Sequence, residues 1–318
     1  VTAGGGTDER YKGAAKLYRF RPKSQFAAMG MLNNINRAGF SFSDYLNFSG
    51  GLQSLMSGGG NFTMEINGEE NLPVDFGQPV TGNVTSEAGG LNYSYEAAKN
   101  RRIGISYMGN GANKKLNEQA WSRNFAQELE YVTDGNTRQQ TDNITHRLNV
   151  NIRNDMDSQT QVTFFANGEL SDSKLSDKGT SSSRVADVLF NTQTSTEYET
   201  ANTLSGKSGL SLTRRTLSGQ DVVTLSGNGD YKQNLKKNEW QNITNFLGQG
   251  QVLNSNLFRD DKVTAYGYSG QASWSHLLGK GYVIEPKVGA GSNIADLNRL
   301  QGTSPGESTK IDSLSPYF

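Results

Sequence analysis

The sequence contains no cysteine and only two histidines, His146 and His276. A chain without cysteine forms no disulfide and offers no thiolate to a metal. Two imidazoles far apart in the sequence also argue against a multi-histidine metal site. We therefore expect neither a metal nor another cofactor.

An excess of charge of one sign and long apolar runs are lacking as well. The chain has 31 basic and 31 acidic residues, so no electrostatic footprint for nucleic acid is visible and no nucleic-acid partner is expected. No apolar run reaches the roughly 18 residues of a membrane-spanning helix. The first residues also lack the basic and then apolar pattern of a signal peptide.

Apolar residues make up only 34% of the 318 residues, while glycine is abundant at 37. The mean hydropathy is −0.64. A conventional core for a chain of this length would be poorly supplied by this composition. We infer that the apolar side chains form a thin layer rather than a compact core.

The segment from Asn143 to Leu170 shows how such a layer is built. Its residues alternate between two kinds of side chain, which predicts a β-hairpin with two different faces. The apolar face carries Ile144, His146, Leu148, Val150 and Ile152, and, after the turn "NDMDS", Val162, Phe164, Ala166, Gly168 and Leu170. The opposite face carries Thr145, Arg147, Asn149, Asn151 and Arg153.

The hairpin pattern recurs along the chain. Short polar turns are predicted at 21–24, 97–102, 154–158, 217–221 and 277–281, and after the first interval they lie about sixty residues apart. Long polar connections, which we expect to be loops, separate them at 34–85, 111–141, 172–207, 233–262 and 293 to the end. Short turns at one end, long loops at the other and strands of about ten residues are typical of a transmembrane β-barrel.

A soluble β-sandwich also alternates apolar and polar residues. Its turns recur every 8 to 12 residues, however, and it does not need all its long loops at one end. We therefore predict an all-β fold, an antiparallel transmembrane β-barrel. About ten or eleven strands are expected within residues 1–318, which we treat as one barrel segment.

The segment "FAAMGMLNNINRAGFSFSDYLNFSGG", Phe26 to Gly51, resembles the barrel region of TonB-dependent receptors and related outer-membrane β-barrel proteins of the Bacteroidetes type. The stretches "VTAGGGTDERY", "GGLNYSYEAAKNRRIGISYMGNG" and "STKIDSL" are similar to the same region. The resemblance implies a bacterial outer-membrane location and, in complete members, a plug domain inside a barrel of 22 strands. Residues 1–318 contain about half of these strands, and we expect no plug, energy-coupling segment or signal peptide within them. Because bare sheet edges are not tolerated in lipid, further residues supply the missing strands or these strands close into a smaller barrel.

Two motifs resemble ligand sites. "ANTLSGKS", Ala201 to Ser208, fits a relaxed phosphate-loop pattern, but the alternation after it predicts a strand where that loop needs a helix. Asp155 and Asp157 lie in a predicted turn, where aspartate is expected for its hydrogen bonds to the backbone. Asp260 and Asp261 lie in a predicted outer loop, where an ion is a weaker alternative.

Charged residues on the polar face are the better site candidates, because they would line a wet lumen and set its selectivity. These candidate lumen-facing residues are Arg102, Arg147, Arg153, Glu169, Asp230, Glu285 and Lys287. Trp121 and Trp240 are candidate ligand contacts in the outer loops. Neither histidine has a serine and an aspartate placed for catalysis, so no catalytic residue is assigned and no enzyme is expected.

Two functions remain open. The chain is part of a receptor or transporter that binds a nutrient, whether a small molecule, a peptide or a glycan, with its loops and passes it through a polar lumen. Alternatively, it is a structural or assembly component that docks other envelope proteins. Outer-membrane lipid is the partner in both cases, and an energy-coupling protein is a partner in the first.

Overall fold

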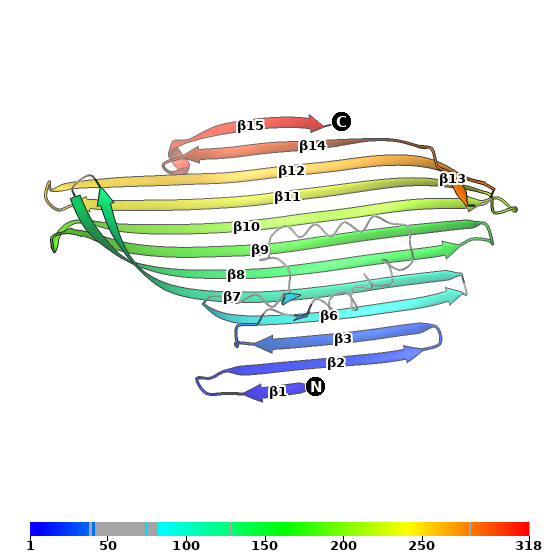
Figure 1. Ribbon diagram of the computed structural model, residues 1–318, viewed down its shortest axis with the longest axis horizontal. Coiled ribbons are helices and arrows are strands. Elements are labelled where there is room, and N and C mark those ends of the chain that lie inside the picture. The colour runs from blue at the N-terminus through cyan, green and yellow to red at the C-terminus, as the bar shows by residue number, and fades with distance from the viewer. Residues whose placement is uncertain are drawn as a thin grey trace.

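The computed structural model describes residues 1–37, 40–41, 74–75, 82–98, 100–126, 129–279 and 281–317. The fold is all-β and is dominated by one 13-stranded antiparallel sheet that is not closed (Figure 1). A second, two-stranded sheet pairs β4 (Phe40–Ser41) with β5 (Val74–Asp75) in parallel. Helical structure in the described part of the chain is a single 3-10 turn, η1 (Pro305–Glu307). No helix there has the length and apolar character needed to cross a membrane.

The strands of the large sheet follow one another in chain order. The exception is β13, which lies outside this order and pairs with the end of β12. The first six are β1 (Thr2–Gly5), β2 (Tyr11–Arg21), β3 (Ser24–Asn33), β6 (Asn83–Ala98), β7 (Arg101–Ala126) and β8 (Leu129–Asp155). The others are β9 (Thr160–Val185), β10 (Val188–Arg215), β11 (Asp221–Phe246), β12 (Gln251–Leu278), β13 (Tyr282–Ile284), β14 (Lys287–Gly302) and β15 (Ser308–Tyr317). β1 and β15 are the two edges of the sheet.

The predicted short turns are confirmed, and they lie together at the right-hand end of the sheet in Figure 1. The turn between β8 and β9 shows the expected chemistry: one side-chain oxygen of Asp157 accepts the backbone N–H groups of Gln159 and Thr160, each at 2.7 Å. These two bonds also lower the pKa of the Asp157 carboxyl. The turn interpretation of this segment is therefore correct.

The predicted long loops at 111–141, 172–207, 233–262 and beyond 293 are wrong. These residues continue the strands, so that β7 to β12 are 26 to 28 residues long. The strand count rises from the predicted ten or eleven to 13, mainly through short strands such as β1 and β13. Most of the remaining predicted loop, 34–85, lies outside the described residues. In these extensions both faces of the strand carry polar side chains, so no alternation marked them in the sequence.

The register places most of the apolar and polar side chains on opposite faces of the sheet, although a small buried cluster of Met29, Ala88 and Met108 lies on the same face as Arg147. Leu148 pairs across with Tyr107 on β7 and with Gly168 on β9, and this row continues through Gly206, Tyr231, Tyr266 and Ile294. We call the face of this row the apolar face and the opposite face the polar face. The phosphate-loop candidate at 201–208 lies within β10, as the strand interpretation predicted.

The apolar face has a band without Asp, Glu, Lys or Arg that crosses nine strands and is interrupted at one margin by Glu87, which lies opposite both Leu32 and Gly111. This apolar band consists of the outward residues of 26–32, 89–95, 103–111, 144–152, 162–170, 204–212, 223–231, 266–274 and 288–294. At a rise of about 3.3 Å per residue, nine residues extend for roughly 26 Å along a strand. An outward apolar band about 25 Å tall is what a transmembrane β-sheet needs.

Burial is inverted relative to a water-soluble protein. Leu148 is 47% exposed, whereas the neighbouring Arg147 is 8% exposed. Among the described residues five apolar and nine polar side chains are buried. The chain exposes 20814 Å², compared with roughly 13,000 Å² for a compact protein of this mass. The sheet therefore has no conventional hydrophobic core.

One glycine on the polar face is required by close packing. A Cβ atom at Gly209 on β10 would overlap the ring of Phe165, its partner on β9, and the side chain of Asn228 on β11. We expect Gly209→Ala to lower the free energy of unfolding by about 1–3 kcal/mol, because the ring must leave its position. Gly227→Ala on β11 is the control, since its nearest neighbour would be 3.8 Å away. Urea unfolding measures both, and equal losses would contradict the packing argument.

Candidate functional site: the polar face of the sheet

The register brings most of the predicted lumen-facing residues to the polar face. Arg147 and Glu169 are directly opposite each other, and so are Arg102 and Arg153. Asp230 shares this face with its partner Lys207 on β10. Lys287 begins β14 on the same face. Glu285 lies between β13 and β14, and its side-chain oxygen is 3.0 Å from the Lys287 ammonium.

A hydrogen-bonded cluster on this face, within the apolar band's height, is built around Arg147. Its Nε donates to Glu169 at 2.8 Å, and its Nη1 donates to Asn110 at 3.4 Å. Thr145 and Ser171, also opposite each other, share a hydrogen bond of 3.1 Å. Burying a guanidinium costs hydration, and the hydrogen bonds from Arg147 to Glu169 and Asn110 offset that cost.

A second cluster lies on the polar face beyond the apolar band. Asp261 on β12 accepts hydrogen bonds from Arg259 Nε at 2.7 Å and from Arg299 Nε and Nη2 at 2.7 and 3.1 Å. Asp261 is 5% exposed. Burial opposes its ionisation, but the bonds from Arg299 and Arg259 outweigh burial and hold the pKa of the carboxyl below its ordinary value. The prediction that Asp260 and Asp261 lie in a loop is wrong, and Asp261 is an ion-pair centre.

A row of directly opposed residues, Asp177, Glu197 and Trp240, crosses β9, β10 and β11 on the polar face. Asn238 donates to Glu197 at 2.6 Å. Burial raises the pKa of the Asp177 carboxyl, the charge of Glu197 adds to the rise, and a hydrogen bond from Gln139 opposes it. Trp240 therefore lies beside carboxylates on a strand, and not in a loop as predicted.

Trp121 does not lie near Trp240. It is on β7, opposite Asp134, on the side of the strand that continues the apolar face beyond the band. It is 64% exposed. Two residues on, the guanidinium of Arg123 lies 5.6 Å from the centre of the Phe125 ring. The far ends of β7 and β8 curl away from the sheet at the left of Figure 1. Trp121, like Trp240, thus lies on a strand and not in a loop as predicted.

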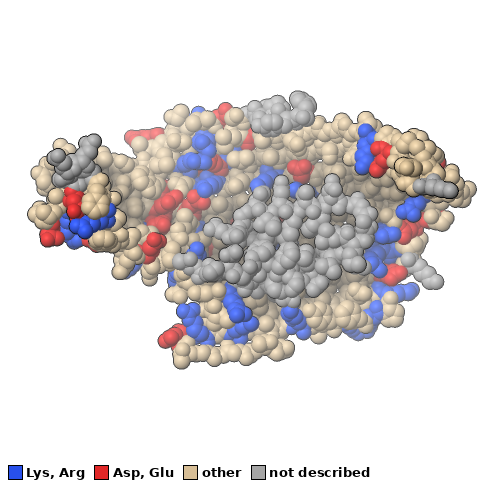
Figure 2. Space-filling view, in the orientation of Figure 1, with Lys and Arg blue, Asp and Glu red and all other residues tan. Residues whose placement is uncertain are grey.

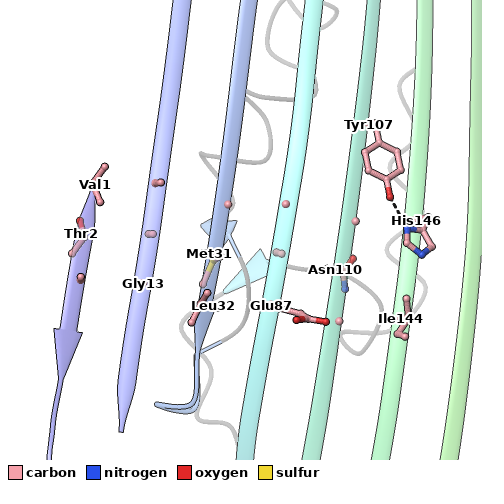
Figure 3. A pocket seen from close by; sticks show the side chains of 18 residues that line it. Val1, Thr2, Gly13, Met31, Leu32, Glu87, Tyr107, Asn110, Ile144 and His146 are labelled. Carbon is pink, nitrogen blue, oxygen red and sulfur yellow. Dashed lines mark hydrogen bonds between the residues drawn. The ribbon is translucent and has the colours of Figure 1, made fainter.

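The apolar face is hollowed where glycines replace side chains. A hollow of about 750 Å³ extends over β2, β3, β6, β7 and β8. Figure 3 shows the Tyr107 hydroxyl directed at His146, and the distance from that hydroxyl to His146 Nδ1 is 2.7 Å. Gly109 leaves room for this pair, and Gly111 leaves room for the Glu87 side chain.

The second histidine, His276, has an aspartate and a tryptophan as neighbours in the described part of the chain. His276 Nδ1 is 2.7 Å from Asp221, which also accepts from the indole of Trp274 at 3.0 Å, and no serine hydroxyl is recorded as a partner of this pair. Within the described ranges no group of three or more His, Asp or Glu side chains is placed to hold a metal ion.

Sequence reasoning missed the Asp261 cluster, because its key partner comes from another strand. Arg259 and Asp261 are two residues apart and so share a face of β12, which the sequence does show. Arg299 lies 38 residues away in the chain, and only the β12–β14 register reveals that it is directly opposite Asp261.

No family model matches the chain, and no curated protein matches it. Several solved structures have a similar arrangement, among them two receptors. The ferric preacinetobactin receptor of Acinetobacter baumannii is 8% identical with a TM-score of 0.29, and the match covers 99% of this chain and 56% of the receptor. The ferric yersiniabactin uptake receptor of Yersinia pestis is 11% identical with a TM-score of 0.21, and the match covers 94% of this chain and 51% of the receptor. The chain thus spans about half the length of these receptors.

Proposed function

We propose that this chain is part of an outer-membrane β-barrel receptor or transporter. Its long strands bind a nutrient on the outer side of the membrane, and its polar face lines the lumen through which the nutrient passes. The apolar band carries the proposal: it crosses nine strands with a charged side chain only at one margin, Glu87, and most of its large apolar side chains remain exposed in the folded chain. Such a band is stable against lipid and unfavourable against water.

The two edges of the sheet must be paired in this environment. Lipid offers no hydrogen bonds to the backbone, so unpaired N–H and C=O groups along β1 and β15 would be strongly unfavourable within the membrane. We propose that further strands of the same polypeptide close the barrel. The open edges also favour a second candidate, a component whose edges pair with strands of another envelope protein.

Cysteine accessibility tests which solvent each face meets. The chain has no native cysteine, so Leu148→Cys and Asn149→Cys can be compared in the full-length protein in lipid vesicles with a water-soluble thiol reagent. We expect Asn149→Cys to react at least about tenfold faster, because lipid covers the apolar face and water fills the lumen.

A sheet in water predicts the opposite order, because Leu148 is 47% exposed and Asn149 is only half-buried and bonded to Ser106 at 3.1 Å. Equal rates, or a faster reaction at position 148, would therefore exclude the membrane proposal. Both variants should react alike after denaturation in detergent, which controls for differences in the thiols themselves.

A further inference from the structure

The two margins of the apolar band carry charges of opposite sign. The short-turn margin is the end of the band nearest the short turns, and the long-strand margin is the end nearest the extensions of β7 to β12. At the short-turn margin the first outward position beyond the band is Arg101 on β7 and Arg214 on β10. Beside the band, β2 ends with Arg19 and Arg21 on the same face as Leu17. We call these four arginines the arginine row.

The long-strand margin is acidic instead. The first outward position beyond the band is uncharged on β7, β10, β11 and β12 and acidic on four other strands. The four acids are Glu87 on β6, Asp142 on β8, Asp172 on β9 and Asp296 on β14. Basic side chains such as Lys174, which is opposite Asp142, lie farther out on their strands. The apolar face therefore presents different charges to the two sides of a bilayer.

The charges of the arginine row are not compensated by carboxylates. All four side chains are exposed, and none of them forms an ion pair with another residue in the described part of the chain. Arg101 Nε donates to the side-chain oxygen of Asn154 at 3.0 Å, but this amide is neutral. Asp157 is close enough to sense the charge of Arg214, yet its hydrogen bonds come from the backbone of its own turn.

A carboxylate on the apolar face at the short-turn margin, Asp221 on β11, is already engaged. It accepts from the Trp274 indole at 3.0 Å and lies 2.7 Å from His276 Nδ1. Figure 2 shows Lys and Arg side chains along the right-hand end of the sheet, where the short turns lie. The arginine row is thus left to interact with groups outside the described chain.

A phospholipid headgroup matches an exposed guanidinium at the edge of an apolar surface. Its phosphate lies directly beside the acyl chains, and an arginine can lay its apolar stem on the sheet while its donors reach that phosphate. Arginine binds phosphate through two parallel hydrogen bonds, which lysine does not offer. Arg101 and Arg214 are separated by β8 and β9, so at about 4.8 Å per strand they lie roughly 14 Å apart and meet different lipid molecules.

We infer that the arginine row binds the phosphate groups of phospholipids in the leaflet that surrounds the short turns. The carboxylates of the long-strand margin repel phosphate, so this recognition is confined to one leaflet and favours one orientation of the sheet in the bilayer. The inference rests on the proposed function, because the arginine row meets headgroups only if the apolar face meets lipid.

Two pairs of neighbouring arginines supply a matched test. Arg101 and Arg214 are on the apolar face, whereas Arg102 and Arg215, the next residue in each case, are exposed on the polar face. Full-length protein in a non-ionic detergent is titrated with phosphatidylglycerol or with a galactolipid that has the same acyl chains and no phosphate. Native mass spectrometry counts the bound lipids. We expect the unmodified protein to bind phosphatidylglycerol at least about fivefold more tightly than the galactolipid.

The double variant Arg101→Gln, Arg214→Gln should lose at least about fivefold in affinity for phosphatidylglycerol and bind the galactolipid as before. Glutamine keeps part of the apolar stem and removes only the charge. The control Arg102→Gln, Arg215→Gln removes the same charge at the same end of the sheet and should keep the original affinity. The comparison of the two lipids needs no substitution, so it stands even if a variant fails to fold.

The inference is overturned if the unmodified protein does not prefer phosphatidylglycerol, or if the two double variants lose affinity equally. Equal binding of both lipids by all the proteins would mean that the apolar face meets lipid without recognising phosphate. If the unmodified protein binds neither lipid, the membrane proposal itself fails.

Discussion

Replacing Leu148 by arginine is expected to destabilise the membrane-inserted protein by about 2–4 kcal/mol, the cost of a charged side chain at the middle of a lipid-facing strand. Leu148 is the central residue of the apolar band on β8, with Ile144 and His146 on one side and Val150 and Ile152 on the other. Lipid cannot hydrate the guanidinium, and from this position the side chain must bend far to reach the headgroups.

Asn149→Arg is the matched control, since the adjacent residue points to the polar face beside Ser106. That face already holds Arg147 and Arg153, so an additional arginine meets water and costs little. Urea unfolding in lipid vesicles compares the two variants. A loss at position 149 equal to that at 148 would mean that both faces meet the same solvent, and the barrel proposal would then be abandoned.

The second large effect is expected at Asp261, where Asp261→Asn should lower the free energy of unfolding by about 2–4 kcal/mol at neutral pH. The substitution removes the buried charge that compensates the partly exposed guanidinium groups of Arg259 and Arg299. Asp260→Asn is the control, because Asp260 forms only an exposed ion pair of 3.5 Å with Lys237. Exposed pairs contribute about 0–1 kcal/mol.

The effect at Asp261 should depend on pH in a defined direction. The pKa of this carboxyl is lower in the folded protein than its ordinary value of 3.8. Its ionised form therefore stabilises the fold fully above about pH 4 and progressively less as the pH falls through the folded pKa. The difference between the native protein and Asp261→Asn should shrink below about pH 4. A difference that stays constant down to about pH 2 would assign the loss to packing instead of charge.

The five short turns could be predicted because each of them combines turn-forming residues with a change from one alternating segment to the next. The turn that connects β9 to β10 could not. It is formed by Ala186 and Asp187, with φ angles of 45° and 66°, and such two-residue turns usually contain Asn or Gly. Alanine gives no turn signal, so the residues around it were assigned to a loop.

The candidate site was predictable to the same degree and for the same reason. Arg147, Glu169 and Asp230 could be assigned to one face because their neighbours alternate with apolar residues. Trp121 and Trp240 lie in parts of their strands where both sides carry polar residues, so the sequence there does not show which residues share a face.

The sequence by itself determined that the chain forms strands with one apolar and one polar face, because a period of two in hydrophobicity arises only where the two sides of a strand meet different surroundings. Only the tertiary structure decided which residues stand opposite one another, and hence the Asp261 cluster and the alignment of the apolar segments into one band across nine strands. Cross-strand register is a relation between residues far apart in the chain, and no local pattern encodes it.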